Sequence, residues 1–212
     1  VGHLGYYYDA IYQHNDFDIK SEGYATDYFS KQAIDFIERN AGKPFLCYIP
    51  YNVQHSPFQV PEKYFDKYKK QGLDDELACI YGMVENMDEN IGLVLGKLEE
   101  LNLTEKTIVI FLSDNGPNTF RYNGDMKGKK GNVDEGGVRV PFYISWPGVI
   151  EAGKSTQLAQ GIDLFPTLLE LCNIDYKPVL PVDGVDLSKT IFRKAENFDR
   201  YIFTRQASYP LE

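Results

Sequence analysis

Short, uniformly apolar runs that alternate with amphipathic helical patterns constrain the fold of this chain most strongly. The segments expected to form strands are residues 44–49, 107–113 and 138–146. Apolar residues at helical spacing predict the longer helices, from Thr26 to Gly42, from about Asp74 to Leu101 and from about Asp163 to Asn173. Strands that lack polar alternation are typical of parallel sheets covered on both faces. We therefore expect an α/β fold with a mostly parallel sheet sandwiched by helices.

The two ends of the chain carry weaker patterns. Residues 1–25 are rich in Tyr, Gly and Asp without clear periodicity, which indicates a loop. A short helix is expected after Pro61, because proline favours the first helical turn. The pattern weakens again after Pro178, where only residues 201–204 indicate a final strand. We assign residues 1–177 to the main domain and 178–212 to an extension that begins a smaller subdomain.

Composition excludes several classes of partner. The chain has 212 residues, of which 43% are hydrophobic, so a globular domain with a sizeable core is expected. Its net charge of −9 argues against nucleic acid and anionic membranes, which both need a basic face. No apolar stretch is long enough to span a membrane. The three cysteines, Cys47, Cys79 and Cys172, lie among apolar residues and are interpreted as reduced core thiols.

The apolar run at 107–113 ends abruptly in Ser113-Asp114-Asn115-Gly116. In an open α/β sheet, active sites form at the carboxyl ends of the strands. A carboxylate followed by a carboxamide offers oxygen ligands that suit Ca²⁺ or Mg²⁺ better than Zn²⁺. Two side chains cannot complete such a coordination shell, and the same tripeptide also favours a simple turn. The tripeptide alone leaves both interpretations open.

His55 follows the apolar run at 44–49, in the segment Asn52-Val53-Gln54-His55-Ser56-Pro57. If the two strands are parallel neighbours, His55 and Asp114 project from the same edge of the sheet. An imidazole there can bind an anion or protonate a leaving oxygen. A loop histidine bonded to backbone is the competing interpretation.

A basic segment follows the Asp-Asn pair. Residues 119–141 contain five positive and three negative side chains, an excess of positive charge in an acidic protein. Lys127, Lys129 and Lys130 each offer an ammonium group for a sulfate or phosphate oxygen, although such runs are often only solvated. The twin glycines that follow Glu135 permit close backbone approach, and Arg139 is expected to pair with Glu135.

Taken together, these motifs resemble the type I (arylsulfatase-like) sulfatases of the alkaline-phosphatase-like superfamily. The resemblance rests on Phe111–Gly116, on His55-Ser56-Pro57 and on Lys130–Pro141, with support from Gly2-His3-Leu4, residues 163–171 and residues 182–187. It implies an alkaline-phosphatase-like fold and a sulfuric ester hydrolase. By the same resemblance, Asp114 and Asn115 bind calcium, with magnesium as the other possible ion. His55 contacts the sulfate and its leaving oxygen, while Lys130, five residues before Glu135, holds the sulfate, with Lys127 and Lys129 as weaker candidates.

Two family features are missing from the sequence. Sulfatases use a formylglycine made from the first residue of a C/S-x-P-x-R motif, and this chain contains no such motif. The paired aspartates of the family's first strand are missing too. We therefore expect residues 1–177 to be the later portion of a sulfatase catalytic domain, with no turnover by this chain alone and weak calcium binding at best.

Two other functions stay open at this stage. One is a phosphoester or phosphonate hydrolase of the same superfamily. The other is a non-catalytic relative that binds sulfated glycans, with sugars stacked on the early tyrosines, although core packing suits these rings better. The resemblance implies a small-molecule or glycan sulfate ester as the ligand and a secreted or periplasmic location. The oligomeric state is not readable from the sequence.

Overall fold

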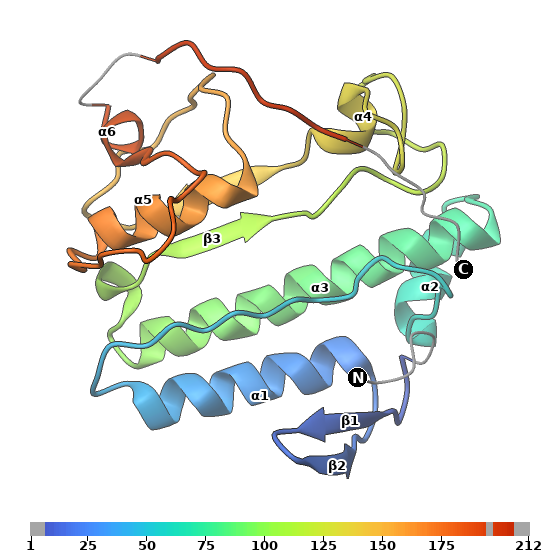
Figure 1. Cartoon of the computed structure of the whole chain (residues 1–212). Helices are drawn as coiled ribbons and strands as arrows, with labels where there is room; N and C mark the ends of the chain where they lie inside the picture. The colour runs from blue at the N-terminus through green and yellow to red at the C-terminus, as the bar shows by residue number, and fades with distance from the viewer. Residues whose placement is uncertain (1–6, 194–196, 206–212) are drawn as a thin grey trace. The chain divides into compact units, whose positions relative to one another are not determined.

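The structure, a computed structural model, describes residues 7–193 and 197–205 (Figure 1). The chain divides into two compact units, residues 1–107 and residues 108–212.

The first unit is built on the long helix α3, Asp75–Glu100. Asp74 caps this helix, because its Oδ1 accepts a hydrogen bond of 2.8 Å from the Leu77 amide. Helices α1 (Ala25–Asn40) and α2 (Glu62–Lys69) both pack against α3, and the 3₁₀ turn η1 (Thr104–Lys106) follows it. The predicted helices are therefore confirmed, including the one after Pro61. Helix α1 begins one residue before the predicted Thr26, because Tyr24 is its N-cap and Thr26 lies buried in the first turn.

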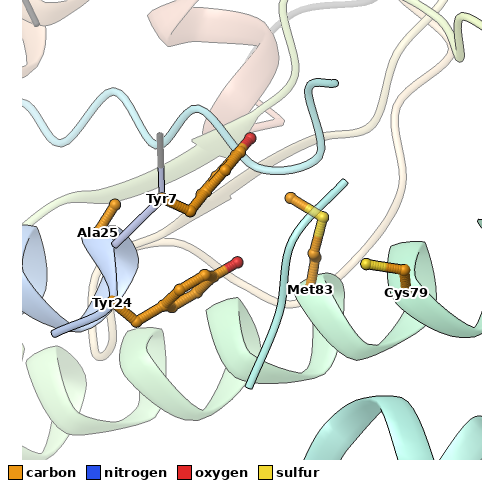
Figure 2. Close-up of a cluster of buried hydrophobic side chains, with 5 residues drawn as sticks. All are labelled: Tyr7, Tyr24, Ala25, Cys79 and Met83. Carbon is orange, nitrogen blue, oxygen red and sulfur yellow. The ribbon is translucent and has the colours of Figure 1, made fainter. Parts of the chain in front are cut away.

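The core of this unit gathers around two stacked tyrosines (Figure 2). Tyr7 and Tyr24 have ring centroids 5.7 Å apart at an interplanar angle of 20°. They pack with Ala25, at the start of α1, and with Cys79 and Met83 of α3. An N-terminal segment predicted to be a loop thus supplies a core residue, Tyr7.

The same N-terminal segment also forms a hairpin that the sequence analysis missed. Strands β1 (Ile11–His14) and β2 (Phe17–Lys20) pair antiparallel, with His14 opposite Phe17. Asn15 and Asp16 form the two-residue turn, and Asn15 adopts a φ of 55°. Asparagine tolerates this left-handed backbone, which two-residue hairpin turns require.

The described part of the second unit contains a two-stranded sheet and four short helices. Strands β3 (Val109–Leu112) and β4 (Phe142–Ser145) pair antiparallel, with Val109 opposite Ser145 and Leu112 opposite Phe142. The helical elements are α4 (Glu135–Val138), η2 (Gly161–Asp163), α5 (Leu164–Leu171) and α6 (Ser188–Ile191). Helix α5 confirms the prediction for residues 163–173.

The strand predictions need two corrections within the described residues. All strand pairs there are antiparallel, and the parallel pairing expected from uniform apolarity does not occur among them. The chain reverses through residues 113–141, so β4 returns beside β3 in the opposite direction. Residues 44–49 are extended but carry no ladder partner in the described part, and residues 201–204 form no strand.

Asp163 organises the C-terminal half of the second unit. Its carboxylate is 1% exposed and accepts hydrogen bonds from the Gln160 amide at 2.7 Å and the Val185 amide at 3.0 Å. Arg200 Nη1 lies 2.7 Å from the same carboxylate. Burial alone raises the pKa of Asp163, but the Arg200 guanidinium and the two amides outweigh it and hold that pKa below its ordinary value.

The cysteines agree in part with the prediction of reduced core thiols. All three cysteines are free thiols, but only Cys79 is buried, while Cys172 is exposed and Cys47 is half-buried. Cys172 is therefore not the core residue that was predicted.

Within residues 7–193 and 197–205, none of the helices is both long and apolar enough to cross a membrane.

Candidate functional site

The predicted metal ligands lie directly after β3, as expected. The Asn115 amide donates a hydrogen bond of 2.8 Å to Asp114 Oδ1, and Asn115 Nδ2 donates one of 2.9 Å to the Gly116 carbonyl. These bonds use the nitrogen of the carboxamide and one oxygen of the carboxylate. In the described part of the chain nothing hydrogen-bonds to the remaining side-chain oxygens, Asp114 Oδ2 and Asn115 Oδ1. Both are therefore free to act as ligands.

Three glycines hold the segment that carries these ligands, which we call the site loop (residues 113–139). The Gly116 amide donates to the Gly137 carbonyl at 2.9 Å, and the Gly136 amide donates to the Lys127 carbonyl at 2.7 Å. A Cβ on Gly116 would lie 1.8 Å from the Gly136 oxygen, and one on Gly137 would lie 2.2 Å from the Asn132 oxygen. This glycine cluster (Gly116, Gly136 and Gly137) leaves no space for a side chain.

The three lysines of the site loop differ in what surrounds them. Lys127 Nζ pairs with Asp134 Oδ1 at 2.9 Å, and Lys129 Nζ lies 4.6 Å from the centre of the Phe120 ring. The Lys130 backbone amide donates to the Pro117 carbonyl at 2.8 Å, which fixes its main chain beside the Asp-Asn turn. Its ammonium group has no partner among residues 7–193 and 197–205, and the side chain is exposed. Among the three lysines, Lys130 is thus the one whose ammonium group meets neither a carboxylate nor an aromatic ring in the described part of the chain.

Glu135 and Arg139 form the expected pair. Arg139 Nη1 lies 3.4 Å from Glu135 Oε1, one helical turn away, and both side chains are largely exposed. A pair of this kind contributes less than about 1 kcal/mol to stability. The pair joins the first residue of α4 to the residue that follows the helix.

The donor set after β3 fits a hard divalent cation but does not complete its shell. Asp114 and Asn115 supply oxygen atoms only, which is the chemistry that calcium and magnesium prefer. No cluster of three or more His, Cys, Asp or Glu side chains suited to a metal occurs within the described ranges. A calcium ion held by Asp114 and Asn115 therefore needs further ligands from outside this pair.

His55 lies in the first unit, on the loop of residues 50–61, which we call the His55 loop. Its ring Nδ1 lies 2.8 Å from the Ser56 carbonyl. A carbonyl only accepts, so Nδ1 carries the proton in this contact and Nε2 is left with a free lone pair. The side chain is exposed. Nε2 is therefore the ring atom that can meet an anion or a leaving oxygen.

Tyr7 contacts the His55 loop and was not identified from the sequence. Its hydroxyl donates to the Asn52 carbonyl at 2.7 Å and to the His55 carbonyl at 2.8 Å. The motif Tyr6-Tyr7-Tyr8 gave no signal that distinguished the middle ring, which is buried, from Tyr8, which is partly exposed. Of the other histidines, His14 lies in β1, and His3 falls outside the described residues.

Comparisons with known proteins identify relatives of most of the chain. A family model described as Sulfatase matches residues 2–174. The N-acetylgalactosamine-6-sulfatase of Mus musculus is 33% identical over 192 residues, which cover 86% of this chain and 35% of the relative. The steryl-sulfatase of Homo sapiens is 32% identical over 186 residues, which cover 82% of this chain and 30% of the relative. The chain thus spans about a third of the length of these relatives.

A solved structure has a similar fold. The crystal structure of Ps i-CgsB in complex with k-i-k-neocarrahexaose matches with a TM-score of 0.81 and 30% identity. The match covers 87% of this chain and 42% of that chain. A structure in complex with its substrate D-glucosamine-2-N,6-O-disulfate matches with a TM-score of 0.69 at 19% identity, which supports the fold alone.

Proposed function

Since the chain belongs to the sulfatase family, we propose that it forms part of an enzyme that hydrolyses a sulfate monoester. The observation that carries this proposal is Lys130, whose ammonium group has no partner among the described residues and whose backbone amide donates to the Pro117 carbonyl close to the Asp114–Asn115 turn. A positive charge on the same loop as a hard-cation site suits a small tetrahedral oxyanion. Sulfatases as a class act on sulfuric esters, so a sulfate is the anion that we assign to this position.

Each residue has a distinct role in the proposed reaction. Lys130 binds a sulfate oxygen and stabilises the negative charge that develops during S–O cleavage. His55, with its proton on Nδ1, accepts a hydrogen bond at Nε2 when neutral, and donates a proton there to the leaving alcohol oxygen when charged. Lys127 is a secondary contact, because Asp134 already neutralises it.

Asp114 and Asn115 are the proposed calcium ligands, through Asp114 Oδ2 and Asn115 Oδ1. When bound, the ion supplies positive charge that polarises the sulfate. The nucleophile expected in the family is a formylglycine, and its C/S-x-P-x-R motif does not occur in these 212 residues. Turnover therefore requires a longer protein than this chain.

The substrate class follows from the relatives only in outline. Steryl-sulfatase is named for a sterol sulfate, and N-acetylgalactosamine-6-sulfatase is named for a sulfated amino sugar. We propose a small-molecule or glycan sulfate ester as the substrate. On the same family resemblance we place the protein in a secreted or periplasmic compartment; recovery of the native protein only from the cytosolic fraction would contradict this.

The pairing of residues 44–49 in the expected parallel sheet is also a proposal. Residues 44–49 alternate between half-buried and exposed positions, and the large apolar side chains of Leu46 and Tyr48 are 79% and 80% exposed. The Phe45 ring packs edge-on against Phe36 of α1. We propose that this segment pairs as a strand in the complete domain. Amides 45–49 should then resist hydrogen exchange in the longer protein, and equal, fast exchange in both contexts would refute the pairing.

Matched substrates test the proposed function. The protein that carries this chain together with a complete sulfatase domain should hydrolyse an aryl sulfate at least about tenfold faster than the corresponding aryl phosphate. A chelator should lower the sulfate activity. The 212-residue chain alone should show no turnover. A preference for the phosphate would favour a phosphoester hydrolase, while normal turnover by the chain alone would show that the missing nucleophile is not required.

A further inference from the structure

The His55 loop is fastened to the core of the first unit by two phenol groups that act at different places. The Tyr7 hydroxyl donates to the carbonyls of Asn52 and His55, at 2.7 and 2.8 Å. The Tyr24 hydroxyl donates to the Gln59 carbonyl at 2.8 Å. One phenol therefore holds the turn that contains His55, while the other holds the end of the same loop.

The turn itself is closed by one backbone bond. The His55 amide donates to the Asn52 carbonyl at 2.9 Å, so the Asn52 oxygen receives both this amide and the Tyr7 hydroxyl. The His55 carbonyl receives the same hydroxyl. The phenol thus contacts both ends of a four-residue turn whose last residue carries the imidazole.

Tyr7 is well suited to fix that turn, because the residue is itself held on every side. It is 2% exposed, and its ring stacks on Tyr24 in the core shown in Figure 2. Its amide donates to Gln59 Oε1 at 3.0 Å, and its carbonyl accepts from the Ala25 amide at 2.7 Å. Burial raises the pKa of Tyr7 to about 12, so the hydroxyl keeps its proton and remains a donor at physiological pH.

We propose that Tyr7 is a positioning residue for His55, whose backbone it holds so that the ring keeps Nδ1 on the Ser56 carbonyl and presents Nε2 outward. The contact with Ser56 needs a fixed backbone on both sides of the ring, at His55 and at the residue that follows it. Tyr7 supplies the fixed point on the His55 side. This inference rests on the proposed function for the role of His55, but not for the geometry.

The geometry is tested by ¹⁵N NMR of the histidine rings in the 212-residue chain, which contains only three histidines. At a pH of about 8.5, where an ordinary histidine is neutral, His55 should show well-separated ring nitrogen shifts with the proton on Nδ1. Tyr7→Phe should collapse this separation toward the average of the two tautomers. Tyr24→Phe removes a hydroxyl from the same core and the same loop, and should leave the His55 ring signals unchanged.

A measurement on the unmodified chain keeps the inference testable even if Tyr7→Phe does not fold. The Tyr7 hydroxyl proton should exchange slowly enough to be observed and should give a nuclear Overhauser effect to the amide of His55 or Ser56. Absence of that effect, or equal changes of the His55 ring in Tyr7→Phe and Tyr24→Phe, would overturn the proposal.

Kinetics separate this inference from the proposed function. In the protein with a complete sulfatase domain, Tyr7→Phe should lower kcat by about tenfold with little change in KM, and Tyr24→Phe should not. A changed tautomer with unchanged kcat would retain Tyr7 as the positioning residue but remove His55 from the reaction. An unchanged tautomer with a lowered kcat would contradict the positioning role.

Discussion

The site loop and the His55 loop solve the same problem by opposite means. Both present a polar side chain to solvent from a fixed backbone. In the site loop, the backbone is fixed by close packing of peptide groups around the glycine cluster, where the space for a Cβ is already filled. In the His55 loop, the backbone is fixed by hydrogen bonds from the hydroxyl groups of the core tyrosines Tyr7 and Tyr24 to loop carbonyls. One loop should therefore be sensitive to added atoms and the other to removed atoms.

The largest effect is expected from adding one carbon to the glycine cluster. Gly116→Ala places a Cβ 1.8 Å from the Gly136 carbonyl oxygen, so the backbone must move. We expect a loss of about 3 kcal/mol in the free energy of unfolding of the second unit. Gly161→Ala is the matched control, since nothing lies within 4 Å of its Cβ. Urea denaturation measures both, and equal losses would show that the glycine cluster is not tightly packed.

A smaller loss, which depends on pH, is expected at Asp163. Asp163→Asn keeps the shape but removes the charge that Arg200 faces, at a cost of about 2 kcal/mol near neutral pH. The folded-state pKa of Asp163 is below its unfolded value, so this contribution is present above the unfolded pKa and is lost as the pH falls through the folded pKa. The variant and the original chain should therefore converge in stability in acid. Unfolding midpoints recorded against pH would contradict this if the difference stayed constant.

The third prediction concerns calcium binding by Asp114, which lies on the site loop next to the glycine cluster. Calcium should bind the 212-residue chain weakly, with a dissociation constant on the order of 10⁻³ M, because this chain contributes few ligands. At about five times that concentration the ion should stabilise the second unit by about 1 kcal/mol. Asp114→Asn should abolish the stabilisation, and Asp125→Asn, a similar exposed aspartate of the site loop, should retain it. Calorimetry that finds the same calcium response in both variants would exclude Asp114 as a ligand.

Local patterns were sufficient to predict helices α1, α2, α3 and α5, but not the short helices α4 and α6 or the pairing of the strands. The spacing in α1, α3 and α5 specifies one buried face, and Asp74 caps α3 by a bond to a residue only three positions away. Strand direction depends on which segments meet, and uniform apolarity does not encode that. The hairpin of β1 and β2 was missed because its turn, Asn15-Asp16, lacks the glycine that usually marks such turns.

In the candidate site, too, local motifs could be read from the sequence, whereas contacts between distant residues could not. The sequence indicated Asp114, Asn115, His55 and a group of three lysines. The choice among these lysines rested on resemblance alone, since the Asp134 pair and the Phe120 ring that occupy the other two become visible only in the folded loop. Tyr7 was out of reach, because its bonds to Asn52 and His55 join residues more than 40 positions apart.

The most direct test of the central claim compares Lys130→Ala with Lys127→Ala in the protein that has a complete sulfatase domain. If Lys130 holds the sulfate, its removal should lower kcat/KM for an aryl sulfate by about 100-fold or more. Removal of Lys127, which pairs with Asp134, should change kcat/KM by less than about threefold. Equal losses in the two variants, or a larger loss in Lys127→Ala, would contradict the assignment of the sulfate to Lys130.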